Sequence, residues 1–79
     1  MSYKLQMPDI GASTDMYLAA WIKEPAQMVS KGEVIAEVLT DKVNTEVPCP
    51  INGVVEALLI EEGERVTVGQ VIARLRNTD

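Results

Sequence analysis

A cysteine and a lysine are the two side chains whose settings bear most on covalent chemistry in this chain. Cys49 is the only cysteine, and it stands between Pro48 and Pro50. The chain contains no His, so neither a histidine base for the thiol nor a Cys/His zinc pattern is available. We therefore expect no metal site and no catalysis by Cys49, whose role is structural or incidental.

Lys42 stands at the centre of a predicted hairpin. Two runs of alternating apolar and polar residues, 34–40 and 43–47, flank the pair Asp41-Lys42. Asp favours a turn because its side chain can bond nearby backbone N–H groups. A two-residue turn brings four pairs face to face: Thr40 and Val43, Val38 and Thr45, Glu37 and Glu46, Ala36 and Val47. This register predicts that the Lys42 amine lies at the tip, in water, and that two like charges oppose each other, which is mildly unfavourable.

The segments around this hairpin are also predicted to be strands. β-branched runs at 53–60 and 70–75, interrupted by Gly and Pro at short intervals, indicate an all-β chain. An internal repeat relates several runs: residues 29–38 align without gaps with residues 66–75, at an offset of 37 positions, and residues 7–11 resemble residues 47–53. Two copies, about 4–41 and 43–76, are expected to pack on each other within a single domain spanning residues 1–79.

Size and charge narrow the classes of function. Seventy-nine residues without a nucleophile–base pair or a metal cluster predict a module that is not an enzyme. The net charge of −5 argues against binding to nucleic acid or to an anionic membrane. No apolar run approaches the roughly 18 residues of a membrane span, and the first five residues lack the apolar core of a signal peptide. We expect a monomer, either free-standing or one domain of a longer protein.

The stretch 36–53, AEVLTDKVNTEVPCPING, resembles the lipoylation site of acyltransferase subunits of 2-oxoacid dehydrogenase complexes. Their pattern is E-x-x-T-D-K-[VA]-x-x-E-[VI]-x-[SA]-P-x-x-G. The resemblance covers nearly the whole chain, with further matches at Met7–Gly11, Trp21, Gly32, Gly63-Glu64 and Val68-Gly69. It implies a flattened barrel of two four-stranded antiparallel sheets with quasi-twofold symmetry, which agrees with the internal repeat.

The resemblance also implies a function. In such domains the lysine at the position of Lys42 forms an amide with lipoic acid, a swinging arm that carries acyl groups and reducing equivalents between active sites. Asp41 and Val43, which flank it, are implied as recognition residues. The implied partners are a lipoate-attaching enzyme, a thiamine-dependent 2-oxoacid decarboxylase, an acyltransferase core and dihydrolipoamide dehydrogenase. The implied compartment is the bacterial cytoplasm or the mitochondrial matrix.

Two other functions stay open on the sequence. Biotinyl domains share this fold and modify a hairpin lysine, but they typically place Met on both sides of it, where this chain has Asp41 and Val43. An unmodified lipoyl-like adaptor is the second, and it has no need of Lys42. The resemblance also has departures: Ala26 replaces a usual turn Gly, and the surface loop 11–17 differs from that of many relatives. The acyl group is therefore not specified, and Glu37 and Glu46 are expected to be ordinary solvated positions rather than recognition residues.

Overall fold

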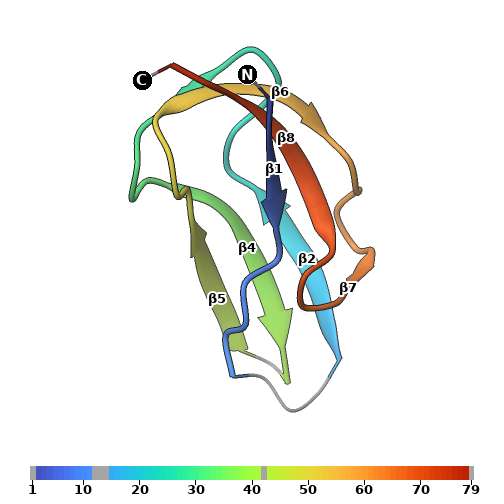
Figure 1. The fold of residues 1–79 in the computed structure, drawn as a ribbon. Coiled ribbons are helices and arrows are strands. Elements are labelled where there is room, and N and C mark those ends of the chain that lie inside the picture. The colour runs from blue at the N-terminus through green and yellow to red at the C-terminus, as the bar shows by residue number, and fades with distance from the viewer. Residues whose placement is uncertain (1, 12–14, 42, 79) are drawn as a thin grey trace.

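The protein is described by a computed structural model that covers residues 2–11, 15–41 and 43–78. Over these ranges the chain is built of strands and contains no helix, as the sequence predicts (Figure 1). The strands are β1 (Ser2–Gln6), β2 (Met16–Trp21), β3 (Met28–Val29), β4 (Val34–Thr40), β5 (Val43–Pro48), β6 (Gly53–Leu58), β7 (Arg65–Val66) and β8 (Val71–Asn77). A membrane-spanning helix is accordingly not found in the described residues.

Two antiparallel four-stranded sheets face each other and form an elongated sandwich. The first has the strand order β1-β8-β6-β3, and the second has the order β5-β4-β2-β7. The molecule measures 35 × 20 × 18 Å. The β4–β5 hairpin occupies one end of the long axis, while β1 begins and β8 ends at the other (Figure 1). The predicted fold class is confirmed.

The two sheets are related by a quasi-twofold symmetry, and the internal repeat in the sequence accounts for it. Strands β2, β3 and β4 recur as β6, β7 and β8 at the offset of 37 positions. The two strands of each equivalent pair lie in different sheets, at the same position in the strand order. The core repeats as well, because buried side chains of the two copies correspond: Leu18 and Val55, Val29 and Val66, Ile35 and Ile72, Ala36 and Ala73, Val38 and Leu75. Each sheet takes two strands from each copy: the first sheet joins β1 and β3 to β6 and β8, and the second joins β2 and β4 to β5 and β7. Neither copy can therefore complete a sheet or bury its core without the other.

The structure corrects one detail of the repeat. The sequence matches Met7-Pro8 to Val47-Pro48, but the hydrogen bonds place Met7 in the position of Cys49. The N–H of Met7 donates to the carbonyl oxygen of Gln70 at 2.8 Å, and the N–H of Cys49 donates to that of Glu33 at 2.7 Å. Short sequence matches with a gap are ambiguous, whereas these bonds define the equivalence.

Two equivalent turns have left-handed residues. Ala26 has φ 76° and Gly63 has φ 91°. The N–H of Ala26 donates to Val55 O and that of Gly63 to Leu18 O, each at 2.7 Å. The turn at Ala26 therefore requires the same positive φ as its glycine counterpart, and an L-residue adopts that conformation with strain.

Candidate functional site

The predicted hairpin register is confirmed by the structure. Strands β4 and β5 pair Thr40 with Val43, and three more pairs follow toward the core: Val38 with Thr45, Glu37 with Glu46, and Ala36 with Val47. Since side chains alternate between the two faces of a strand, one face of the hairpin joins the core and the other faces solvent. Val38, Ala36 and Val47 are fully buried and fix the base of the hairpin.

The tip of the hairpin follows the chemistry of a tight turn. Asp41 has φ 39°, in the left-handed region that two-residue hairpin turns require and that Asp tolerates better than most residues. Asp41 is exposed, and the side chain of Val43 is 60% exposed. Lys42, the predicted attachment residue, lies outside the described residues. The two predicted recognition residues thus project on either side of its position in the chain.

A neighbouring strand braces the hairpin. Met16, at the start of β2, pairs with Thr40 at the end of β4. Asp15, the residue before it, accepts a 2.7 Å charge-assisted bond from Arg65 of β7. The C-terminal end of the predicted loop 11–17 is therefore held beside the hairpin, and its last two residues already belong to β2; residues 12–14 lie outside the described part. Gly11, at the other end of that loop, donates its N–H to Asp9 at 2.9 Å.

The remaining sequence candidates lie away from the tip. Trp21 packs against the core and donates its ring N–H to Ile60 O at 2.9 Å, so it is a packing residue. Cys49 is buried, and its thiol lies 3.2 Å from Ile51 O. Among the described residues, no cluster of His, Cys, Asp and Glu could hold a metal ion.

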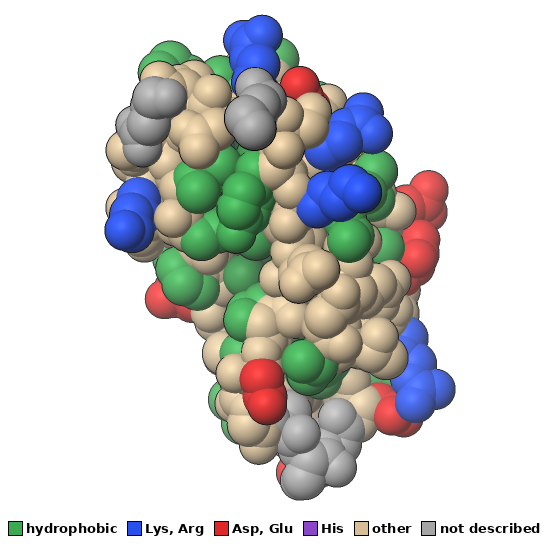
Figure 2. Space-filling model, viewed as in Figure 1, with side chains coloured by type: hydrophobic (Ala, Val, Ile, Leu, Met, Phe, Trp, Pro, Cys, Tyr) green, Lys and Arg blue, Asp and Glu red, His purple; other side chains and the backbone are tan. Residues whose placement is uncertain are grey.

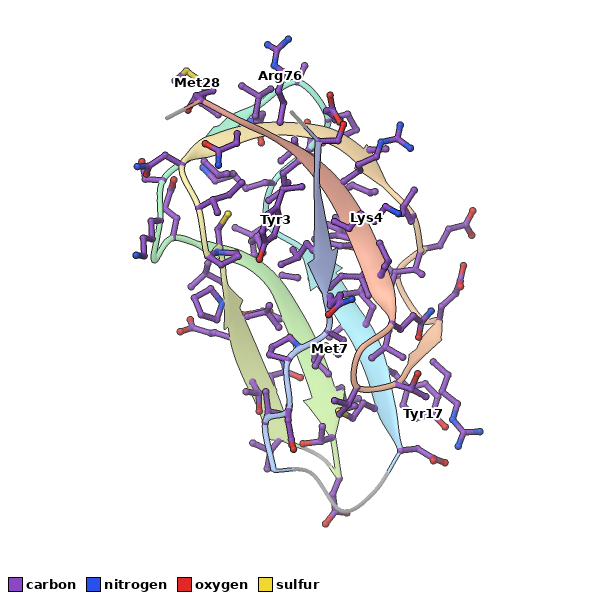
Figure 3. All side chains as sticks on the ribbon, viewed as in Figure 1. Tyr3, Lys4, Met7, Tyr17, Met28 and Arg76 are labelled. Carbon is purple, nitrogen blue, oxygen red and sulfur yellow. The ribbon has the colours of Figure 1, made fainter. Side chains whose placement is uncertain are left out.

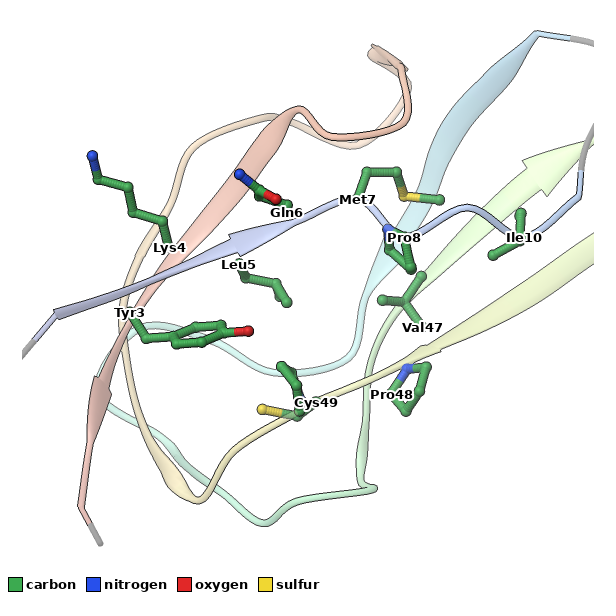
Figure 4. A pocket seen from close by; sticks show the side chains of 11 residues that line it. Tyr3, Lys4, Leu5, Gln6, Met7, Pro8, Ile10, Val47, Pro48 and Cys49 are labelled. Atoms are coloured by element: carbon green, nitrogen blue, oxygen red, sulfur yellow. The ribbon is translucent and has the colours of Figure 1, made fainter.

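An apolar groove, which the sequence does not predict, separates the edge strands of the two sheets. Its volume is about 500 Å³, and β1 and β5 form its two walls. Tyr3 and Leu5 point across it toward Val47 and Cys49, while Lys4 points away (Figure 4). A view of the same face of the molecule shows apolar side chains among Lys and Arg in the upper half (Figure 2). The groove is the open side of the sandwich, where the two sheets do not pair.

One carboxylate has a displaced pKa. The ammonium of Lys23 lies 2.9 Å from Glu33, and this hydrogen-bonded pair lowers the pKa of the Glu33 carboxyl, helped by the N–H of Ser30. Gln70 takes the same place in the second copy and accepts the N–H of Thr67. The Glu33 carboxylate therefore stabilises a turn and is not placed for proton transfer.

Comparison with known proteins agrees with the fold and the hairpin. A family model described as "Biotin-requiring enzyme" matches residues 3–75. The dihydrolipoyllysine-residue acetyltransferase component of the pyruvate dehydrogenase complex of Corynebacterium glutamicum is 39% identical over 80 residues, which cover 100% of this chain and 12% of that protein. The dihydrolipoyllysine-residue succinyltransferase component of the 2-oxoglutarate dehydrogenase complex of Escherichia coli K12 is 41% identical over 76 residues, covering 95% of this chain and 19% of that protein.

A solved structure extends the likeness to three dimensions. The lipoyl domain of the 2-oxoglutarate dehydrogenase complex of Azotobacter vinelandii superposes with a TM-score of 0.73 and is 31% identical. The superposition covers 94% of this chain and 95% of that domain. The chain therefore matches nearly the full length of that solved domain, but it spans only about a fifth or less of the length of the curated relatives it matches.

A sandwich of two repeated sheets that presents a tight hairpin at one end defines the class of small carrier domains. The matches then define the family: the chain belongs to the biotin- and lipoyl-domain family, and within it to the lipoyl domains of 2-oxoacid dehydrogenase acyltransferase components. Such a domain is a non-catalytic carrier, since the catalytic part of these proteins lies in a separate domain.

Proposed function

We propose that this domain carries lipoic acid in amide linkage to Lys42 and serves a 2-oxoacid dehydrogenase complex. The observation that supports the proposal most is the hairpin: a lysine follows Asp41 in a turn whose register matches the one expected for lipoyl attachment. When bound, lipoic acid supplies a dithiolane that accepts an acyl group together with two electrons and later releases both. Asp41 and Val43 flank the lysine where an attaching enzyme must approach.

The residues of this chain fit that cofactor. A lysine amine can form an amide with the carboxyl group of lipoic acid. Because this bond is covalent, the domain needs no further binding site to hold the cofactor. The hairpin supplies a rigid support because its base is fully buried at Ala36, Val38 and Val47. A flexible arm on such a support samples nearby active sites at a high effective concentration, whereas a mobile domain surface would blur its reach. Amide formation also removes one positive charge, which makes the net charge −6 from −5.

We further propose the partners that this role requires. They are a lipoate-attaching enzyme, a thiamine-dependent 2-oxoacid decarboxylase, an acyltransferase core and dihydrolipoamide dehydrogenase. The relatives serve pyruvate, branched-chain and 2-oxoglutarate complexes at 39%, 40% and 41% identity, so similarity does not select the acyl group. Because these relatives are bacterial proteins, we propose a bacterial cytoplasmic location.

Intact-mass analysis with peptide mapping tests the proposal. The chain is co-expressed with a lipoate ligase and a biotin ligase in medium that contains both cofactors, beside control domains that each ligase modifies. We expect a single lipoyl adduct, on Lys42, and none in Lys42→Arg, which should melt at the same temperature as the parent. A biotin adduct would move the domain to the carboxyl carriers. An unmodified chain beside modified controls would favour an adaptor.

A further inference from the structure

A row of side chains crosses the outer face of the second sheet close to the hairpin tip. Tyr17 of β2 is flanked by Arg65 of β7 on one side and Leu39 of β4 on the other, and Leu39 is paired with Asn44 of β5. Tyr17 is 40% exposed and Leu39 is 38% exposed. An aromatic and an aliphatic side chain thus lie directly opposite each other in solvent, two positions along β4 from Asp41.

The internal repeat shows that the fold does not require this apolar pair. At the offset of 37 positions, Tyr17 corresponds to Val54 and Leu39 to Arg76, and these two residues are paired in the first sheet. Met28 takes the place of Arg65 in that equivalent row. In Figure 3, Met28 and Arg76 lie at the upper end of the molecule, whereas Tyr17 lies at the lower end of β2. The exposed tyrosine–leucine pair belongs only to the sheet that bears the hairpin.

The charges of the two faces also differ. Beyond the apolar pair, Glu37 and Glu46 lie opposite each other, and within the described part of the chain neither forms an ion pair. The equivalent pair in the other sheet consists of Lys4 and Arg74. Related positions therefore carry two carboxylates on the second sheet and two cations on the first, where Arg74 also lies 3.6 Å from Glu56. The like-charged pair of glutamates is mildly destabilising by itself, which a cationic partner surface would relieve.

The distance to which each partner enzyme must approach the domain indicates which of them binds this face. The enzyme that forms the amide must bring its reacting groups to the lysine amine, which stands only four methylene groups from the backbone. Enzymes that act on the dithiolane reach it farther from the domain, at the end of the lipoyl chain. The attaching enzyme therefore approaches the domain body most closely. Leu39 lies about 7 Å along the strand from Asp41, at about 3.4 Å per residue, which is within such a footprint.

We propose that Tyr17 and Leu39, bordered by Glu37 and Glu46, are the docking face for the enzyme that attaches lipoate to Lys42. This inference rests on the proposed function. The partner surface presents an apolar recess for the tyrosine–leucine pair, bordered by Lys or Arg side chains opposite the two glutamates. Tyrosine is enriched among binding hot spots, and an apolar centre with a polar rim is the usual arrangement of an interface.

Initial-rate kinetics of modification tests the docking face. The unmodified chain is incubated with purified lipoate ligase, lipoate and ATP, which activates the carboxylate for amide formation, and product is counted by intact mass. We expect the double variant Tyr17→Thr with Leu39→Thr to lose about tenfold or more in kcat/KM, mainly through KM. Thr is β-branched and suits a strand, and circular dichroism checks the fold. Met28→Thr, which changes an exposed apolar residue in the equivalent row of the first sheet, is the control and should be modified at the parental rate.

A charge variant separates docking from stability. Glu46→Lys replaces the like-charged pair by an attractive one, so it should melt at or above the parental temperature while its KM for the ligase rises. Glu24→Lys makes the same change of charge in an exposed turn far from the hairpin and should leave the KM unchanged. The advantage of the parent over Glu46→Lys should shrink as salt is added.

Each outcome separates the two levels of the argument. Parental kcat/KM in the folded double variant would overturn the docking face and leave the carrier function intact. Normal lipoylation combined with slow reductive acylation by a decarboxylase would overturn it too, since the face would then serve the decarboxylase. Failure of the ligase to modify the parent at Lys42, beside a modified control domain, would overturn the proposed function and this inference with it.

Discussion

The turn at Ala26 allows a quantitative test of backbone strain, because an alanine there has a positive φ. Ala26 has φ 76° in a turn where the equivalent Gly63 has φ 91°. Left-handed backbone costs a residue with a Cβ about 1–2 kcal/mol relative to Gly. Replacing Ala by Gly also loosens the unfolded chain, which offsets about 0.4–1 kcal/mol of that gain. Ala26→Gly should therefore stabilise the domain by about 0.8 kcal/mol.

The second copy supplies the opposite experiment. A Cβ built on Gly63 meets no atom within 4 Å, so Gly63→Ala adds backbone strain without a steric clash. It should destabilise the domain by the same amount, about 0.8 kcal/mol. The double variant, which exchanges the two turns, should have nearly the parental stability because the sites lie in different turns.

Thermal and urea unfolding measure these differences. For a domain of this size, about 0.8 kcal/mol corresponds to a shift of roughly 3–6 °C in Tm. Circular dichroism and the fluorescence of Trp21, the only tryptophan, provide two independent probes of one transition. A loss of stability in Ala26→Gly would refute the strain argument. So would a loss of several kcal/mol in Gly63→Ala, since it would mean that the turn is held by contacts rather than by backbone preference.

Four further predictions follow from single contacts. Gly53→Ala should unfold the domain or destabilise it by more than about 3 kcal/mol, because a Cβ there would lie 2.3 Å from the carbonyl oxygen of Arg76; urea unfolding measures the loss. Because the pKa of the Glu33 carboxyl is lower in the folded protein than its unfolded value near 4.5, the carboxylate adds stability above that pH, and this is lost as the pH falls through the folded pKa. Glu33→Gln should abolish this contribution. Its melting temperature, measured from pH 2 to 7, should therefore depend less on pH than that of the parent. Lys23→Met should raise the pKa of Glu33 toward its ordinary value, measured by NMR titration of that carboxyl. Trp21→Phe removes an indole bond to a backbone carbonyl and should cost about 1–3 kcal/mol by the same unfolding assay.

Local sequence determined much of the fold and of the hairpin. Alternation of apolar and polar residues sets which face of a strand is buried, and a shift of one residue would turn Val38 and Val47 into solvent. The pairing of Thr40 with Val43 followed from this constraint together with a two-residue turn at Asp41. The repeat was visible because both copies solve the same packing problem with residues of similar size, as Ile35 and Ile72 do.

The tertiary structure decided what lies beside the hairpin. Tyr17 becomes the neighbour of Leu39 only when β2 pairs with β4, and an irregularity between Leu18 and Ala20 shifts that register in a way that alternation does not predict. Arg65 joins the row through β7, about fifty positions away along the chain. The groove between β1 and β5 likewise depends on two sheet edges that do not pair. Local periodicity thus determined which side chains face solvent, and long-range pairing determined which of them share a surface.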